Sequence, residues 1–573
     1  MTVADLILKY LVNEGVEYVF GISGAALNNF LVAFNRNPRI KTVVTKHEGG
    51  AAFMADGYAR VRGGLGACFA TSGPGATNLV TGVATSYTDN TPVIVFTGQV
   101  ATTDYGKGTF QDSTKRGVDA VSIFDPITKS SSMILSRAKA EDEIRDAIRI
   151  ALSGRRGPVH LSLPKDVVGA PLHGEVAQPP LHRYPHNYFD RELTIEAAQK
   201  LVNAKSPAML VGYGAAAANA CNSIRELAEL LHIPVATTPK AKGTFPEDHP
   251  LSLGVFGLCG SPLAESWIKS GRTDVLLVVG ASLNQMTTLS WDPRLAPTDT
   301  LIHVNIDAAE IGKNYRADLP LVGDAMTVID EIAFRVLRFL NELGDRKTKR
   351  EQEVAELREK VGRYLNPGDM TSEQVPIHPA RLIKDLEKGL PENAILFSDT
   401  GNHTDWAIHY LCVKRPGSFI APFGMLPMGY ATAAAVGGKF AAPDRPVVAL
   451  VGDGCFMMNG MEVATAVDYN IPVVWVVMNN AKLGMAYDIQ KLVGIENPVA
   501  SHFRPVNIAR VAEGYDAVGI RVTKPGELAE LLPKAIASGR PTVLDCVIAR
   551  ETIPPLAPYV ESQKAFFKRA DML

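Results

Sequence analysis

The amino-acid sequence predicts an α/β protein made of three doubly wound domains, each built on a parallel sheet. Apolar runs of strand length alternate with helix-like segments almost throughout the chain. Such alternation is typical of parallel strands covered by helices on both faces. A length of 573 residues corresponds to about three domains at roughly 100–200 residues each. Two stretches without this alternation divide the chain accordingly.

These two stretches set the expected domain limits. Residues Pro171 to Pro185 are rich in proline and histidine and lack periodicity, so we interpret them as a linker. Residues Asn341 to Pro367 are strongly charged and lead into Asn-Pro-Gly, which predicts a solvated surface helix followed by a turn. We therefore expect domains at residues 1–170, 190–340 and 375–573.

Each expected domain contains several apolar runs that predict buried strands. In the first domain the predicted strands are Val16–Ile22, Ile40–Thr45, Gly66–Thr71, Pro92–Thr97 and Pro158–Leu163, with helices at Ala51–Arg62 and Ala76–Thr88. In the second they are Ala208–Gly212, Val275–Gly280 and Leu301–Ile306. In the third they are Ala394–Ser398, Pro446–Val451, Pro472–Met478 and Pro541–Val547.

The composition limits which binding partners and which cellular compartment are expected. The formal net charge of −2 provides no overall basic field, so we expect neither a nucleic-acid nor a membrane partner. No run of 18 apolar residues suggests a membrane span. The six cysteines are scattered without a Cys-x-x-Cys pair, and the N-terminal segment lacks the pattern of a signal peptide. We therefore expect a cytoplasmic protein without a disulfide framework or zinc site.

Two oxygen-bearing motifs follow neighbouring predicted strands of the third domain. Gly452-Asp453-Gly454 follows the run Pro446–Val451, and Asn479-Asn480 follows the run Ile471–Met478. The 24 residues between the motifs suffice for one crossover helix, so both motifs emerge where open α/β sheets bind ligands. Carboxylate and amide oxygens suit Mg2+, which completes its shell with phosphate and water. Alone, each motif also fits a turn or a helix cap; together they predict a cation site.

This arrangement resembles the thiamine-diphosphate (ThDP) enzyme superfamily, and the chain resembles its acetolactate synthase group nearly from end to end. The segments that carry the resemblance are His47-Glu48, Thr71 to Asn78, Gly98-Gln99-Val100, Phe110-Gln111, Pro164-Lys165-Asp166, Ile306-Asp307 with Glu310 to Asn314, and Leu483-Gly484-Met485. The resemblance implies a pyrimidine-binding, a central and a diphosphate-binding domain, in that order.

The resemblance also implies a set of cofactor contacts. It places Mg2+ on Asp453, Asn480 and the carbonyl of Lys482. Met428 matches the apolar residue that supports ThDP, and the carbonyl of Leu426 matches the acceptor for its amino group. The family usually has Gly-Ala where this chain has Leu426-Pro427, so the local shape is expected to differ. The other implied ThDP contacts are Gly24, Ser72, Asn78, Asn402, His403, Gly452, Gly454, Cys455, Gly484 and Met485.

Glu48 is the candidate for the acid that activates the cofactor. It follows the run Ile40–Thr45 and precedes a helix, where a carboxyl group becomes shielded from water. In the family, a glutamate hydrogen-bonded to the pyrimidine ring promotes loss of the thiazolium proton. On its own, Glu48 also fits a surface residue at a helix N-terminus. Because Glu48 and the cation motif lie in different domains, the resemblance implies a site at a subunit interface, in a homodimer or homotetramer.

The resemblance implies a carboligase that decarboxylates pyruvate or a related 2-oxo acid and transfers the enamine-bound fragment to a second carbonyl acceptor. Gln111 and Phe110 would flank the acceptor channel, and Lys165 would approach it from the neighbouring chain. Two departures affect substrate choice. The family's Pro-Gly-Gly is Ser23-Gly24-Ala25 here, and the stretch Ala486 to Gln490 lacks the tryptophan of the anabolic enzymes.

A third departure is an insertion of about five residues after Gln111. The inserted stretch Asp112–Asp119 adds Lys115 and Arg116 near the expected channel mouth. These cations could neutralise an anionic substrate or belong to a solvated loop.

The central domain leaves the flavin question open. Anabolic acetolactate synthases bind FAD through an Arg-Phe-Asp-Asp-Arg stretch, which is Ser282 to Met286 here. Asp307 and the Gly212–Gly214 turn could still hold an adenosine-type ligand. The domain is therefore expected to bind FAD, ADP or neither.

Other reactions of the superfamily remain open. Oxalyl-CoA decarboxylases and 2-hydroxyacyl-CoA lyases usually end in a basic tail, whereas this chain ends in the weakly basic KAFFKRADML. A sulfoacetaldehyde acetyltransferase or a simple decarboxylase fits the same motifs. A non-catalytic binding protein is the remaining alternative, against which the intact Glu48, Asp453 and Asn480 argue.

Overall fold

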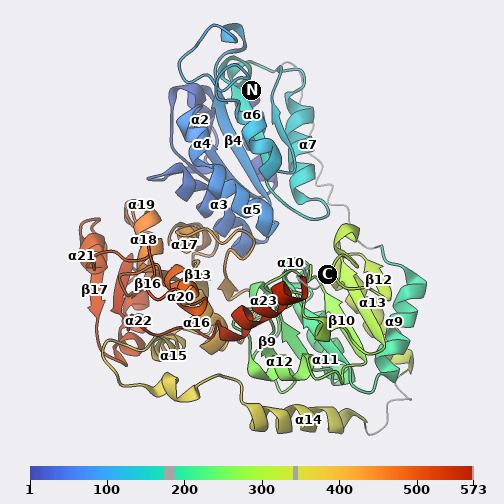
Figure 1. Ribbon diagram of the computed structural model, residues 1–573. Coiled ribbons are helices and arrows are strands. Elements are labelled where there is room, and N and C mark those ends of the chain that lie inside the picture. The colour runs from blue at the N-terminus through green and yellow to red at the C-terminus, as the bar shows by residue number, and fades with distance from the viewer. Residues whose placement is uncertain (173–187, 340–345, 571–573) are drawn as a thin grey trace.

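The computed structural model describes residues 1–172, 188–339 and 346–570, and within them the chain forms three six-stranded parallel sheets, each flanked by helices (Figure 1). This architecture confirms the predicted three-domain α/β fold class. Most of the expected linker, from residue 173 to Pro185, lies outside the described residues. No helix in the described part of the chain is long and apolar enough to span a membrane.

The first sheet carries its strands in the order β2-β1-β3-β4-β6-β5. The strands are β1 (Tyr18–Gly21), β2 (Lys41–Val44), β3 (Gly66–Ala70), β4 (Val93–Gln99), β5 (Ser131–Met133) and β6 (Val159–Pro164). The helices are α1 (Val3–Asn13), α2 (Asn28–Phe34), α3 (Glu48–Arg62), α4 (Pro74–Asn78), α5 (Val80–Asp89), α6 (Ala120–Phe124), α7 (Ala140–Leu152) and α8 (Lys165–Gly169).

The second sheet belongs to the central part of the chain and has the order β12-β11-β10-β7-β8-β9. The strands are β7 (Ala208–Val211), β8 (Val235–Thr237), β9 (Ser252–Val255), β10 (Val275–Val279), β11 (Thr300–Asn305) and β12 (Leu319–Val322). The helices are α9 (Arg191–Asn203), α10 (Tyr213–Ala217), α11 (Cys221–Leu231), α12 (Pro262–Ile268) and α13 (Ala325–Phe339).

The third sheet, with the order β14-β13-β15-β16-β18-β17, repeats the strand order of the first. The strands are β13 (Ile395–Ser398), β14 (Phe419–Ile420), β15 (Val447–Gly452), β16 (Val473–Asn479), β17 (Val518–Val522) and β18 (Thr542–Val547). The helices are α15 (Pro379–Gly389), α16 (Asn402–Tyr410), α17 (Tyr430–Ala441), α18 (Asp453–Asn459), α19 (Glu462–Asp468), α20 (Gly484–Leu492), α21 (Ile508–Glu513), α22 (Glu527–Ala537) and α23 (Ala557–Ala570).

The charged stretch before the third domain forms a helix, as predicted, but one that is not wholly solvated. Helix α14 (Arg346–Val361) buries Val354 completely and leaves Arg350 only 4% exposed. The guanidinium of Arg350 donates to the carbonyl of Leu231 at 2.6 Å. One side of α14 therefore packs on the central domain, where the sequence predicts a helix surrounded by water.

Helices α3 and α17 join the first and third domains through their backbones (Figure 1). A methyl group on Gly57 would lie 2.1 Å from the carbonyl oxygen of Ala434, and one on Gly437 would lie 1.9 Å from that of Met54. Only glycine permits so close an approach. As a result, the core residues of the two domains form one continuous cluster that includes Phe20 and Tyr430.

A buried group of charges lies where the three domains meet. Arg60 of α3 pairs with Asp56 at 2.7 Å and with Asp89 at 2.6 Å, and Asp89 also pairs with Lys240 of the central domain at 2.6 Å. The third domain contributes the hydroxyl of Tyr430, which donates to Asp56 at 2.6 Å. The side chains of Asp56, Arg60 and Asp89 are at most 3% exposed. We call these five residues the junction cluster.

Candidate functional site

The two oxygen-bearing motifs lie side by side at the carboxyl edge of the third sheet. Strand β15 ends at Gly452 and strand β16 at Asn479, and their register pairs Gly452 with Met478. Helix α18 begins at Asp453, so the carboxylate stands at the point where the backbone leaves the sheet. The structure thus places Asp453 and Asn480 together, as the spacing of the motifs predicts.

Backbone amides hold the Asp453 carboxylate in place. Oδ2 accepts from the N–H groups of Ala481 at 2.6 Å and Asn480 at 3.1 Å, while Oδ1 accepts from Gly454 at 2.9 Å. Burial raises the pKa of Asp453 to about 6, against the lowering effect of these hydrogen bonds. The oxygen Oδ1 of Asn480 accepts from the backbone of Lys482 at 3.3 Å. The carboxylate oxygens of Asp453 and the amide oxygen of Asn480 are thereby oriented by backbone N–H groups, and no ion pair to Asp453 forms within the described residues.

A cavity of about 380 Å3 opens beside these oxygens. Most of the residues expected to bind a cofactor line it: Asn402, His403, Leu426, Met428, Gly452, Asp453, Gly454, Cys455, Asn480, Lys482, Gly484 and Met485. The structure therefore brings together side chains that are separated by more than 80 residues of sequence.

Several polar atoms on this wall are buried without a partner among the described residues. They are Oγ1 of Thr400, Oδ1 of Asn402 and Nε2 of His403. Burial lowers the pKa of His403 to about 3, so its imidazole is neutral. Because buried polar groups normally have hydrogen-bond partners, three unpaired atoms on one wall indicate a polar ligand.

Asp488 of α20 is a residue of this site that the sequence does not predict. It is fully buried, pairs with the Nζ of Lys482 at 3.1 Å and accepts a hydrogen bond from Nδ2 of Asn402. Burial raises the pKa of Asp488, and Lys482 opposes that shift. Asp488 thus neutralises Lys482 and fixes the orientation of Asn402. It belongs to no recognised motif, so only its place in the fold identifies it.

Asp399, His403 and Cys455 form a compact buried group whose possible ligand atoms lie within 4.8 Å of one another. The Asp399 carboxylate accepts from the backbone N–H groups of Gly429 and Ala431, each at 2.8 Å. Burial raises its pKa to about 6. These contacts tie the strand β13 end to the start of α17, which gives Asp399 a structural role beside the cavity.

Glu48 lies in the first domain as the first residue of α3, which is capped by His47. Its side chain is buried, and Oε2 accepts from the Nδ2 of Asn78 at 2.9 Å. Glu462 of α19, which the sequence does not predict, accepts from the N–H of His47 at 3.0 Å and of Lys46 at 3.2 Å. A carboxylate of the third domain therefore positions the turn before Glu48. Glu48 does not line the cavity beside Asp453 in this chain.

The expected acceptor residues lie on the first domain with differing exposure. Gln111 adopts a positive φ of 54° and stands next to Gly73, whereas the Phe110 side chain is 84% exposed. Lys165 is half-exposed, with its Nζ 3.9 Å from Asp104. Ser72 is buried, and a methyl group on Gly24 would lie 2.3 Å from the hydroxyl of Thr71. These five residues occupy the carboxyl edge of the first sheet but do not line the Asp453 cavity.

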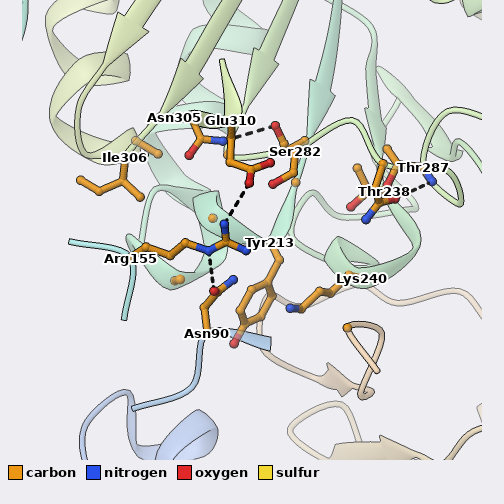
Figure 2. A pocket seen from close by; sticks show the side chains of 18 of the residues that line it. Asn90, Arg155, Tyr213, Thr238, Lys240, Ser282, Thr287, Asn305, Ile306 and Glu310 are labelled. Atoms are coloured by element: carbon orange, nitrogen blue, oxygen red, sulfur yellow. Dashed lines mark hydrogen bonds and ion pairs between the residues drawn. The ribbon is translucent and has the colours of Figure 1, made fainter. Parts of the chain in front are cut away.

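A third site is a cavity of about 350 Å3 at the carboxyl edge of the central sheet (Figure 2). Its floor is the glycine turn Gly212–Gly214, where a methyl group on Gly212 would lie 2.3 Å from the Gly280 carbonyl oxygen. Figure 2 shows Arg155 between Asn90 and Glu310, and Lys240 beside the ring of Tyr213. Asp307, expected here, is not among the lining residues: it caps a short 3-10 helix and faces Arg155 at 3.5 Å.

Comparison with known proteins links these sites. Residues 1–122 match the thiamine pyrophosphate enzyme N-terminal TPP binding domain, residues 194–332 the central domain, and residues 399–546 the C-terminal TPP binding domain. The chain belongs to the thiamine pyrophosphate enzyme family. Thiamine pyrophosphate is another name for ThDP, so the predicted family and the predicted ThDP cofactor are confirmed.

The relatives of this thiamine pyrophosphate enzyme include acetolactate synthases over nearly the whole chain. It is 38% identical to a probable acetolactate synthase large subunit of Methanocaldococcus jannaschii, over 97% of this chain and 93% of the relative. It is 34% identical to the acetolactate synthase large subunit of Corynebacterium glutamicum, over 96% of this chain and 87% of the relative. It is 33% identical to the acetolactate synthase isozyme 3 large subunit of Escherichia coli, over 94% of this chain and 92% of the relative. The protein is thus a ThDP-dependent enzyme of acetolactate synthase-like type.

The cavity beside Asp453 suits the diphosphate end of ThDP and its metal. Its donor set offers a carboxylate and an amide oxygen, the ligands that Mg2+ prefers, and the unpaired atoms of Thr400, Asn402 and His403 offer hydrogen bonds to a polar ligand. A methyl group on Gly454 would lie 2.8 Å from the side chain of Leu483, so glycine keeps this wall open.

The family's usual glycine is replaced by Leu426, and the backbone there keeps a conformation that favours glycine. Leu426 has a φ of 57° and its N–H donates to the carbonyl of Pro422 at 3.0 Å. A leucine in this region is strained by roughly 1–2 kcal/mol. The backbone at Leu426 thus has a left-handed conformation that glycine favours, although the residue is a leucine.

Proposed function

We propose that this ThDP enzyme decarboxylates pyruvate or a related 2-oxo acid and joins the resulting fragment to a second carbonyl compound. The observation that carries the proposal is the presence of both halves of the machinery. One half is the oxygen-lined cavity at Asp453 and Asn480, and the other is the buried Glu48 held by Asn78. The names of the relatives support the same reaction.

Each half has a distinct task in the proposed reaction. Asp453 and Asn480, with the carbonyl of Lys482, would hold Mg2+, and Asn402 and His403 would contact the diphosphate. ThDP, when bound, supplies an electron sink for the negative charge left by loss of CO2. Glu48 would hold or release a proton at its Oε1, because Oε2 already accepts from Asn78. Leu426 and Met428 would exclude water from the reacting end of the cavity.

The two halves would meet in an assembly of two or four chains. Glu48 does not line the Asp453 cavity of its own chain, so we propose that the Glu48 of one chain serves the cavity of another. The exposed apolar side chains of Met457 and Met458 on α18, at 55% and 51% exposure, support an interface beside the cation site. Phe110 is likewise an exposed aromatic side chain.

The test of the reaction is turnover with ThDP, Mg2+ and a panel of 2-oxo acids, in which CO2 release is followed and products are identified by mass. We expect CO2 release from pyruvate or a near relative and a product that contains two carbonyl-derived fragments. Glu48→Gln should nearly abolish turnover while ThDP and Mg2+ still bind. If no 2-oxo acid releases CO2, the proposal fails and acyl-CoA thioesters form the next panel. Full activity of Glu48→Gln would refute the assigned role.

The test of the assembly is complementation between two inactive variants. Glu48→Gln and Asp453→Ala are co-expressed with different tags, so that mixed assemblies form at random. For paired sites at a two-fold interface, half of the dimers are mixed and each regains one intact site, so about a quarter of wild-type activity should return. No recovery in purified mixed assemblies would contradict a site shared between chains.

In the central cavity we propose an adenosine diphosphate moiety. Arg155, Lys240 and Lys313 line the cavity beside the Gly212–Gly214 turn, and each also pairs with a carboxylate that the diphosphate would share or displace. A volume of about 350 Å3 lies at the small end of ligand sites, which span roughly 300–1,000 Å3. This favours ADP over complete FAD. The visible spectrum of the purified protein and chromatography of the ligands released on denaturation distinguish the two: flavin absorbance would refute the choice of ADP.

A further inference from the structure

A separate cavity of about 720 Å3, which we call the loop cavity, lies at the carboxyl edge of the first sheet. Its walls include Gln99 at the end of β4, Met133 at the end of β5, and Lys115 and Arg116. Ligands of open α/β sheets bind at such edges. The segment Asp112–Asp119, which carries both cations, is expected from the sequence to be inserted relative to the acetolactate synthases. The loop cavity shares no lining residue with the Asp453 cavity.

Gln99 presents an unpaired hydrogen-bond donor at this site. The side chain is 1% exposed and lines the loop cavity. Its Oε1 accepts from the backbone N–H groups of Val100 at 2.9 Å and Ser113 at 3.2 Å, which fixes the orientation of the amide. Nε2 has no partner among the described residues. A buried amide N–H without a partner is costly, and an acceptor atom of a ligand would supply that partner.

The inserted segment adds positive charge to the same cavity. Lys115 and Arg116 are exposed, and neither has an ion-pair partner in the described part of the chain. The nearby carboxylate of Asp119 is occupied at the start of α6, where it accepts from the N–H of Ser122 at 3.2 Å and from its hydroxyl at 2.7 Å. Burial raises the pKa of Glu143, the other acid in the wall. The two cations without ion-pair partners and the unpaired donor of Gln99 are the groups that an anion would contact.

We propose that the loop cavity binds a small organic anion of the carboxylate or phosphate class, whose charge pairs with Lys115 and Arg116 and whose oxygen accepts from Nε2 of Gln99. Hydrogen bonds would connect the ligand site to the part of the first domain that holds Glu48. Oγ of Ser113 accepts from the N–H of Gly73 at 2.8 Å, and Gly73 begins the turn that leads to Asn78, the partner of Glu48. Such an anion is either the distal end of a substrate or an effector.

Binding is measured by isothermal titration calorimetry of the full-length protein with ThDP and Mg2+. The probes are 2-oxoglutarate, its monocarboxylate counterpart 2-oxovalerate, and inorganic phosphate. We expect 2-oxoglutarate to bind at least about tenfold tighter than 2-oxovalerate, since only the former has a second carboxylate for the two cations, and phosphate to compete with it. Raising the salt concentration should weaken binding of 2-oxoglutarate, because Lys115 and Arg116 are exposed.

Two variants and one control test the assigned contacts. Lys115→Ala/Arg116→Ala should abolish the preference for 2-oxoglutarate. Gln99→Glu keeps the acceptor oxygens but removes the donor and adds a charge, so it should weaken binding at least about tenfold. Lys107→Ala, which removes an exposed lysine of the same loop outside the cavity, should bind like the wild type. The thermal midpoint of each variant verifies folding. The proposal is overturned if no probe binds, or if the double variant keeps the preference.

Analysis of the reaction products distinguishes whether the bound anion is a substrate or an effector. If 2-oxoglutarate is a substrate, its carbons enter the product, and the double variant lowers kcat/KM for it but not for pyruvate. If it is an effector, it changes pyruvate turnover without entering the product. The inference is independent of the proposed reaction. A protein that releases CO2 from no 2-oxo acid, yet binds 2-oxoglutarate through Lys115 and Arg116, would refute the reaction and support the loop cavity site.

Discussion

Replacing Asp89 by asparagine tests whether the junction cluster holds the three domains together. Asp89 is completely buried and faces two cations, Arg60 and Lys240, each at 2.6 Å. Burial raises its pKa, but Lys240 and Arg60 outweigh burial and hold the pKa below its usual range. The carboxylate is therefore ionised in the folded protein. Asp89→Asn preserves the shape and leaves two buried cations with the single charge of Asp56.

The cost follows from the loss of one partner of a buried ion pair, which is about 3–5 kcal/mol. The entropy of unfolding is roughly 2.1 cal/mol/K per residue, or about 1.2 kcal/mol/K for all 573 residues. If the three domains unfold together, the thermal midpoint should fall by about 3 °C. If the first 170 residues unfold alone, their smaller entropy makes the shift about 11 °C. Asp89 of the first domain pairs with Lys240 of the central domain and accepts from the N–H of Gly424 of the third domain at 2.8 Å, so we expect the smaller shift.

Differential scanning calorimetry is the assay, and a second substitution provides the check. Adding Lys240→Met removes the surplus cation, so the double variant should recover at least half of the lost midpoint. The control is Asp142→Asn, which breaks an exposed pair with Arg145 and should shift the midpoint by less than about 1 °C. The reasoning is refuted if Asp89→Asn melts within 1 °C of the wild type, or if Lys240→Met adds to the loss.

Three further predictions address the third domain. Asp453→Ala should weaken Mg2+ binding by at least about 100-fold, since it removes the only carboxylate of the proposed ligand set. Calorimetric titration with Mg2+ in the presence of ThDP measures the affinity, and an unchanged affinity would exclude Asp453 as a ligand. In urea denaturation, the free energy of unfolding of Leu426→Gly should exceed that of Leu426→Ala by about 1 kcal/mol, because only glycine removes the strain of the positive φ. The reverse order of stability would show that the strain is negligible. Asp405 is buried, which raises its pKa to about 8 from an ordinary 3.8. The folded protein therefore binds one more proton than the unfolded chain between about pH 4 and pH 8, and this contribution to stability declines as pH rises through that range. Asp405→Asn should remove this decline, so the variant should gain thermal stability relative to the wild type at pH 8 but not at pH 5; equal differences at both pH values would contradict the prediction.

Most of the strands that could be predicted are almost completely buried, although the exposed edge strand β2 is predicted as well. Runs such as Val275–Gly280 and Pro446–Val451 correspond to β10 and β15, whose side chains are almost all buried. Six strands escape prediction, and five of these lie at sheet edges: β5, β9, β12, β14 and β17. Some of these edge strands are partly exposed: β5 has no fully buried residue, and β12 alternates buried and exposed residues. The edge strand β9 is fully buried but only four residues long. The sequence of β5, Ser-Ser-Met, has no continuous apolar run to indicate a strand.

The site was predictable where a motif concentrates in a few residues, and not where it depends on distant contacts. The motifs at Asp453 and Asn480 each follow a strand, and their spacing along the chain predicts that the two strands are neighbours and that the motifs meet at one edge of the sheet. Glu462 approaches the turn before Glu48 from more than 400 residues away, and Asp488 reaches Asn402 across 86 residues. Neither acid belongs to a local pattern, so only the folded chain identifies them.

The repeated strand order of the first and third sheets has an evolutionary meaning. Strands β3 and β4 occupy the places in the first sheet that β15 and β16 occupy in the third. The Gln99 end of β4 is therefore the counterpart of the Asn479 end of β16, where the proposed metal ligands begin. Such a correspondence is expected of a duplicated ancestral domain whose two copies later diverged. In such a pair the two carboxyl edges carry different groups: the third sheet has Asp453 and Asn480, whereas the first has Glu48 and the basic segment Asp112–Asp119.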